Sequence, residues 1–248
     1  MMWPARTGRW EGGPARALLS PSPRAADVFH FPILFLLAIS CAIAQQPENL
    51  SYSINWPSGL SLGEGSITSA PSGHHIDLSL KLEATIPGYP LRDEYRSRAS
   101  VEFCSDTFEK LSTHGTRVTS EKSVFDAGQK LLRRETSKGG KSELAIGPCA
   151  KDALTFLFFL RKELAQGRIP SPQTLYFGAP YQATFKFAGT HQLKVGDNRV
   201  EADRVTVSMK GPASTTNFEI SFARDAVRTP LVIRSQFVMG SFSMELVP

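Results

Sequence analysis

Apolar and polar residues alternate along several segments of the chain. The clearest segment runs from His75 to Ile86 (HIDLSLKLEATI), where every second residue from Ile76 onward is apolar or small and those between are polar. Period-two alternation places one face of a strand on a core and the other in water, as in antiparallel sheets. The same alternation recurs at 181–187, 218–222 and 242–246. These segments predict half-buried strands.

Turn-forming residues separate the predicted strands. Examples are Pro57-Ser58-Gly59, Gly139-Gly140 and Gly196-Asp197-Asn198. Many short strands with frequent turns predict a mainly β fold, either a strongly curved antiparallel sheet or a half-open barrel. Within 199–209 the apolar positions change phase, which predicts a β-bulge near Asp203-Arg204.

One segment, Gly147 to Pro170 (GPCAKDALTFLFFLRKELAQGRIP), departs from this alternation. Its apolar residues fall at helical spacing, Asp152 suits the first turn, and Gly167 suits the end. We expect one central α-helix from about Asp152 to Gln166, and its apolar face is broader than a surface helix needs. It would pack on the concave face of the sheet, as a core element or as a lid over a ligand cavity. The expected core-lining or cavity-lining residues are Leu154, Phe156, Leu157, Phe158, Leu160 and Leu164.

The first part of the chain has the anatomy of a secretory signal peptide. An apolar run from Phe31 to Ile43 is too short for a comfortable membrane span, and it ends in Ala42-Ile43-Ala44, a small-residue cleavage pattern. Cleavage between Ala44 and Gln45 would leave 45–248 as a single β-rich domain in the periplasm or outside the cell, after an N-terminal extension and signal peptide at 1–44. An uncleaved anchor and lipid attachment at Cys41 are the alternatives.

The distribution of charge predicts no nucleic-acid partner. Without residues 1–44, the loss of four arginines and two acidic residues lowers the formal net charge from +5 to +3. The remaining basic residues are interleaved with acidic ones, as in Arg92-Asp93-Glu94. A nucleic-acid surface would require clustered basic residues.

Two cysteines, Cys104 and Cys149, remain after removal of the signal peptide. An even count in an oxidising compartment favours a disulfide, with two buried free thiols as the alternative. Closing a loop of about 45 residues would stabilise the fold by roughly 4 kcal/mol on the chain-entropy model. Neither cysteine has neighbours at metal-ligand spacing, so we expect no metal site.

Few residues suggest catalysis. The adjacent His74 and His75 would point to opposite faces of a strand and could not chelate one ion together. The chain has no G-x-S-x-G nucleophile motif, and its Gly-rich stretch from Ser58 to Gly65 lacks the Lys-Ser/Thr end of a phosphate-binding loop. Arg161 is unusual on so apolar a helix, and we expect it to pair with a carboxylate such as Asp225, holding the helix to the sheet.

Four motifs, in this order, resemble a known family: LSYSINWPSGLSLGEGSIT near the start of the mature chain, DALTFLFFLR in the middle, and FEISFARDAVRTPLVIRS and GSFSMELV towards the end. The chain resembles the domain of unknown function 3108 family of exported bacterial proteins over nearly all of 48–248. The resemblance implies a curled β-sheet in the broad style of periplasmic lipid-binding half-barrels. It implies no catalytic residues.

We therefore expect a non-enzymatic exported envelope protein without a cofactor and without a stable transmembrane span. Its partner would be an apolar small molecule or lipid, or an envelope protein. The alternatives are an envelope enzyme with an unrecognised site and a purely structural or assembly factor. The inner face of the sheet discriminates among them, because an open apolar cavity suits a carrier and converging polar groups suit an enzyme.

Overall fold

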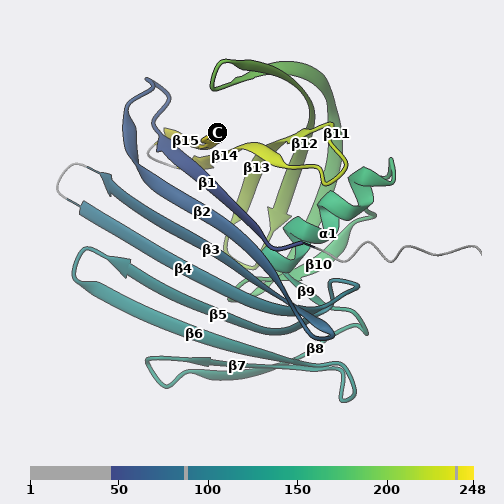
Figure 1. The fold of residues 1–248 in the computed structure, drawn as a ribbon. Coiled ribbons are helices and arrows are strands. Elements are labelled where there is room, and N and C mark those ends of the chain that lie inside the picture. Colours follow the sequence, from purple (N-terminus) through teal and green to yellow (C-terminus); the bar gives the residue numbers. More distant parts are fainter. Residues whose placement is uncertain (1–45, 87–88, 238–239) are drawn as a thin grey trace, which may run out of the picture. The chain divides into compact units, whose positions relative to one another are not determined.

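Fifteen strands and one helix form the described part of the chain, residues 46–86, 89–237 and 240–248, in the computed structural model (Figure 1). The predicted cleavage site at Ala44–Gln45 lies outside these residues. The strands are β1 (Glu48–Asn55), β2 (Ser61–Ser72), β3 (His75–Ile86), β4 (Tyr89–Ser100), β5 (Ser105–His114), β6 (Arg117–Asp126), β7 (Leu131–Thr136), β8 (Lys141–Ala145), β9 (Lys151–Asp152), β10 (Gln173–Tyr176), β11 (Pro180–Val195), β12 (Asn198–Lys210), β13 (Thr215–Ala223), β14 (Pro230–Phe237) and β15 (Gly240–Leu246).

All the described strands belong to one sheet. Its order is β8-β7-β6-β5-β4-β3-β2-β1-β15-β14-β13-β12-β11-β10-β9. Consecutive strands pair antiparallel from β1 to β8 and from β10 to β15, whereas β9 and β10 pair parallel across the helix. The early and late strands meet where β1 pairs with β15. The strand order ends at β8 on one side and at β9 on the other, so the sheet is not closed. The prediction of a mainly β, half-open architecture is confirmed to this extent.

The helix α1 (Ala153–Ala165) begins and ends as its sequence predicts. Asp152 is the N-cap, and its side chain accepts hydrogen bonds from the backbone N–H groups of Leu154 and Thr155. At the other end Gly167 adopts a positive φ of 71°. The N–H of Gly167 donates to the carbonyl of Leu164 and the N–H of Arg168 to that of Glu163, which is the Schellman pattern.

The buried residues of α1 divide between two hydrophobic clusters. Leu154 and Phe158 pack in a cluster with residues of the early strands, such as Phe108. A second cluster joins other helix residues to β10–β13, through Leu175 and Phe222 for example. Figure 1 shows α1 beside β9 and β10, with β1 to β8 side by side in one broad layer. The helix therefore contacts both halves of the sheet.

Five of the six expected helix residues are buried and one is not. The buried residues are Leu154, Phe156, Phe158, Leu160 and Leu164. Leu157 is only partly buried and contacts both clusters. Five of these residues thus lie in the hydrophobic clusters, while Leu157 lies at the boundary between the two clusters.

The predicted β-bulge lies on the neighbouring strand. Pairing of β11 with β12 shifts register between Phe187 and Thr190, and Gly189 there has a φ of 106°. The bulge lies opposite Arg204, close to the predicted position, but the extra residue is on β11, because β12 pairs regularly with β13 through Asp203-Arg204. The phase change in β12 has another cause, because Ala202 packs in a third cluster with residues of β13 and β14.

Candidate functional site

The N-terminus of α1 is built on a carboxylate without solvent contact. Asp152 is 0% exposed. Its Oδ1 accepts from Ser97 Oγ at 2.8 Å and from two backbone N–H groups of the helix, and its Oδ2 accepts from Ser105 Oγ and Thr155 Oγ1 at 2.7 Å each. Burial raises the pKa of the Asp152 carboxyl, and the hydrogen bonds to it act in the opposite direction. With its donors provided by β4, β5 and α1, this carboxylate fixes the helix to the sheet.

A disulfide between Cys104 and Cys149 lies beside this junction, with 4.7 Å between the two Cα atoms, as predicted. It links the segment before β5 to the segment before β9. Next to it, the Lys151 Nζ donates to the Cys149 carbonyl at 3.1 Å and lies 4.4 Å from the centroid of the Phe159 ring. Burial lowers the pKa of Lys151. The disulfide and the hydrogen bonds of Asp152 thus attach the same end of α1 to the sheet.

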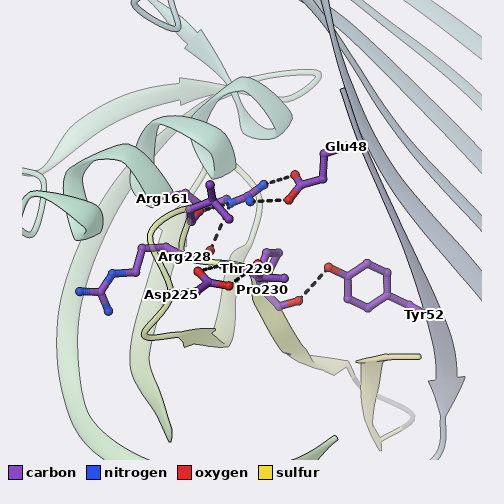
Figure 2. Close-up of polar contacts among 8 residues, drawn as sticks. Glu48, Tyr52, Arg161, Asp225, Arg228, Thr229 and Pro230 are labelled. Atoms are coloured by element: carbon purple, nitrogen blue, oxygen red, sulfur yellow. Dashed lines mark hydrogen bonds and ion pairs between the residues drawn. The ribbon is translucent and has the colours of Figure 1, made fainter. Parts of the chain in front are cut away.

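Arg161 fastens the helix near its other end, and Figure 2 shows its partners. Its guanidinium donates to the two carboxylate oxygens of Glu48 on β1 at 2.6 and 2.8 Å. The Nε also donates to the backbone carbonyls of Val227 and Arg228, at 3.0 and 3.1 Å. Arg161 is 5% exposed, so this bidentate pair is largely screened from water. The contact joins α1 to both β1 and the loop before β14.

The predicted partner of Arg161 was wrong. The Asp225 carboxylate accepts instead from the backbone N–H of Thr229 at 3.0 Å and from its hydroxyl at 2.7 Å (Figure 2). Asp225 therefore closes a turn within its own loop. The loop contacts Arg161 through two backbone carbonyls, and the positive charge of the Arg161 guanidinium is balanced by Glu48 from β1. Close to the same loop, the Tyr52 hydroxyl donates to the Pro230 carbonyl at 2.8 Å, and burial raises the Tyr52 pKa.

The inner face of the sheet is the face that contacts α1, and its burial falls with distance from the helix. On β3, Ile76 and Leu78 are each 2% exposed. Further along the same face, Leu80 and Leu82 are only partly buried, although both pack against the first cluster. The helix therefore covers one end of the inner face more completely than the other.

The inner face also changes from apolar to polar across the strands. One cross-strand row passes from Ile67 through Leu80 to Tyr95, and then to Lys110 and Glu121. Directly opposed residues of neighbouring strands share a face, so Lys110 and Glu121 lie on the same side as the apolar residues. The early strands thus provide apolar residues, while β4 to β6 add polar ones at the same level.

Several of these polar groups are paired. Arg134 donates to Glu121 at 2.6 Å, and the His114 ring lies 2.9 Å from Asp93. Burial raises the pKa of the Tyr95 hydroxyl, and the nearby Asp93 charge adds to the increase. The loop between β10 and β11 approaches this region, because a side chain at Gly178 would meet the Glu121 carboxylate at 3.4 Å. This loop lies over the polar part of the inner face.

Sequence reasoning missed this polar region. Tyr95 and Lys110 belong to strands in which charged and polar residues occupy both faces, so the period-two pattern marks no inward side. Only the strand register identifies the inward residues. In the described ranges no group of three or more His, Cys, Asp or Glu side chains is placed to hold a metal ion. His75 lies 3.2 Å from Asp106, in a pair that is partly open to solvent.

No helix in the described part of the chain has both the length and the apolar character needed to span a membrane.

Comparison with known proteins places this fold in a family. The model of the family described as "Protein of unknown function (DUF3108)" matches residues 51–247. Among solved structures, the chain is similar to a beta-barrel-like protein of domain of unknown function DUF1849 from Brucella abortus, with a TM-score of 0.57 and 9% identity over 83% of this chain and 98% of that one. At this identity the likeness concerns the fold alone. No curated protein matches the chain. Because the family model extends from β1 to the end of β15, the chain belongs to the DUF3108 family, as its motifs predicted.

Proposed function

We propose that this is an exported protein of the cell envelope, periplasmic or secreted, that binds an apolar ligand without transforming it. The ligand would lie on the inner face, which we take to be the concave face of a curved sheet, beside α1. Export, the curvature of the sheet and the presence of a ligand are all parts of this proposal.

The partly exposed apolar residues of the inner face carry the proposal. They come from β3, α1, β14 and β15: Leu80, Leu82, Leu157, Ile233 and Met244. Each packs against a hydrophobic cluster on one side and retains exposed surface on the other. Contiguous apolar surface of this kind is typical of binding sites, because soluble proteins otherwise keep such patches small.

In this proposal α1 is a fixed wall of the site. The Asp152 hydrogen bonds, the nearby disulfide and the Arg161–Glu48 pair hold it near both ends. A lid would need few fixed contacts, so that it could open. Because α1 is held in place, the ligand would enter away from the helix, where Leu82 is partly exposed.

Fluorescence of N-phenyl-1-naphthylamine, a neutral apolar probe, tests the proposal. We expect the purified protein to bind the probe with a saturable increase in emission. Leu82→Asn should weaken binding, whereas Leu111→Asn should not, because Leu111 is an exposed leucine, 45% accessible, on the opposite face of the sheet. Native mass spectrometry of protein from its own envelope should also detect a co-purified lipid. Absence of saturable probe binding together with absence of a co-purified lipid would contradict the proposal.

A further inference from the structure

The ammonium group of Lys110 lies on the inner face without a carboxylate partner. Lys110 forms no ion pair or hydrogen bond with any residue that the structure describes. Its Nζ instead lies 5.1 Å from the centroid of the Phe177 ring and 5.7 Å from that of Tyr95. Cation–π contacts of this kind are weak, and they leave the ammonium donors available.

The nearby charges do not neutralise Lys110. Glu121 is opposite Lys110 in the strand register, but its Oε2 accepts from Arg134. Asp93 lies beside His114 at 2.9 Å. Glu121 is thus engaged by Arg134 and Asp93 by the His114 ring, whereas Lys110 forms no ion pair with an acidic side chain among the described residues.

The same region holds buried polar atoms without a hydrogen-bond partner. They are Glu121 Oε1 and Arg134 Nε. The Glu121 side chain is 10% exposed and that of Arg134 27% exposed. Buried polar groups are nearly always paired, so the Arg134 Nε–H is a donor available to an acceptor on a ligand, whereas Glu121 Oε1 needs a donor such as bound water.

Apolar surface adjoins Lys110 on the same face. Leu80 lies two strands from Lys110 in a single cross-strand row, which at about 4.8 Å per strand places the two backbones about 10 Å apart. An elongated ligand can therefore contact the leucines with its apolar part and Lys110 with its head.

We propose that the ligand is a single-chain amphiphile with an acidic head, a carboxylate or a phosphate, and that Lys110 binds this head while the chain lies along Leu80 and Leu82. This inference rests on the proposed function and specifies the ligand class of the same site. The head is proposed to be acidic because Lys110 has no acidic partner among the described residues.

Displacement of bound N-phenyl-1-naphthylamine by twelve-carbon competitors tests the inference. The competitors are dodecanoate and dodecyl phosphate, each below its micelle-forming concentration, and the neutral dodecanol, below its solubility limit. A charged hydrogen bond is worth about 1.5–3 kcal/mol, so dodecanoate should displace the probe at about 10- to 100-fold lower concentration than dodecanol. A stronger effect of dodecyl phosphate than of dodecanoate would identify the head as a phosphate.

Variants assign the preference to one residue. Lys110→Gln should remove the advantage of the acidic competitors and leave dodecanol unchanged, and Lys110→Arg should retain most of it. The matched control is Lys122→Gln, because Lys122 lies on the other face of β6, 2.9 Å from Glu109. Thermal unfolding of each variant checks that the fold is intact.

The possible failures are distinguishable. Equal displacement by dodecanoate and dodecanol in the unmodified protein overturns the acidic-head inference and leaves the apolar site standing. Loss of the preference in Lys122→Gln as well as in Lys110→Gln overturns the assignment to Lys110. Failure of the unmodified protein to bind the probe at all counts against the proposed function, and the inference falls with it.

Discussion

The two ends of the inner face differ in what covers them. Near α1, apolar residues are buried, and polar ones such as Asp152 are fully hydrogen-bonded. Away from α1, apolar residues such as Leu82 remain partly exposed, and Lys110 has no hydrogen-bond or ion-pair partner among the described residues. The helix-covered end is therefore expected to contribute most to stability, and the proposed function assigns the ligand to the other end. Substitutions at the two ends should therefore separate stability from binding.

Asp152→Ala should have the largest effect on stability. It removes the helix N-cap and leaves the hydroxyls of Ser97, Ser105 and Thr155 without their shared acceptor. A lost cap costs about 1 kcal/mol and each of the three buried hydroxyls left unpaired at least about 1 kcal/mol, so we expect a loss of at least about 4 kcal/mol in the free energy of unfolding. Urea denaturation measures it.

The control for Asp152 is Asp126→Ala. Asp126 also accepts from a backbone N–H, that of Gln129, but at an exposed position. This change should cost less than about 1 kcal/mol. Equal losses in the two variants would show that burial of the Asp152 carboxylate is unimportant.

Leu160→Ala and Leu82→Ala test the comparison directly. Leu160 is 0% exposed, and its truncation should cost about 2–5 kcal/mol. Leu82 is partly buried, and its truncation should cost less than about 1.5 kcal/mol while weakening binding of the apolar probe. If Leu82→Ala lost more stability than Leu160→Ala, the assignment of the two ends would be reversed.

Glu48→Gln should have a smaller effect. It leaves the 5% exposed Arg161 without a carboxylate, at a cost of about 1–3 kcal/mol in the free energy of unfolding. The matched change Asp225→Asn keeps an oxygen that can accept from the Thr229 N–H, and should cost less than about 1 kcal/mol. A larger loss in Asp225→Asn would show that the turn closed by Asp225 contributes more to stability than the Arg161–Glu48 ion pair does.

The smallest effect concerns pH and Lys151. Burial lowers its pKa in the folded state, so the unfolded chain binds more protons between the lowered value and the ordinary value near 10.4. The contribution of Lys151 to stability should therefore rise with pH through that window. The free energy of unfolding can be measured at pH 7.5 and pH 10 for the unmodified protein and for Lys151→Met. Between these pH values, the stability of the unmodified protein should rise relative to that of Lys151→Met. Movement in the opposite direction would mean that burial does not dominate its titration.

Local patterns predicted much of the fold. The boundaries of α1 follow from Asp152 and Gly167, whose capping roles depend only on neighbours in the chain. The alternation in β3 correctly identifies its inward residues because apolar side chains mark that face. The disulfide followed from the number of cysteines and the expected compartment.

Features that depend on distant pairing could not be predicted in this way. The Arg161–Glu48 contact requires β1 to lie beside the helix, which no local pattern indicates. The predicted partner, Asp225, belongs to the loop that contacts Arg161, but its carboxylate accepts hydrogen bonds from Thr229 within that loop. The sequence alone does not indicate these hydrogen bonds. The inward direction of Lys110 depends on the register of β4 with β5, because both faces of these strands carry polar residues.

The pairing of β1 with β15 has a consequence for the order of folding. Elsewhere in the described sheet, antiparallel partners are consecutive strands, so their ladders close short loops and have low contact order. Tyr52 opposes Leu246 across the β1–β15 pair, a contact that closes nearly the whole domain. The consecutive ladders should form early, and the encounter of β1 with β15 should be the slow step. Glu48 and Tyr52 both lie on β1, and their hydrogen bonds to Arg161 and Pro230 stabilise the β1–β15 pairing after it has formed.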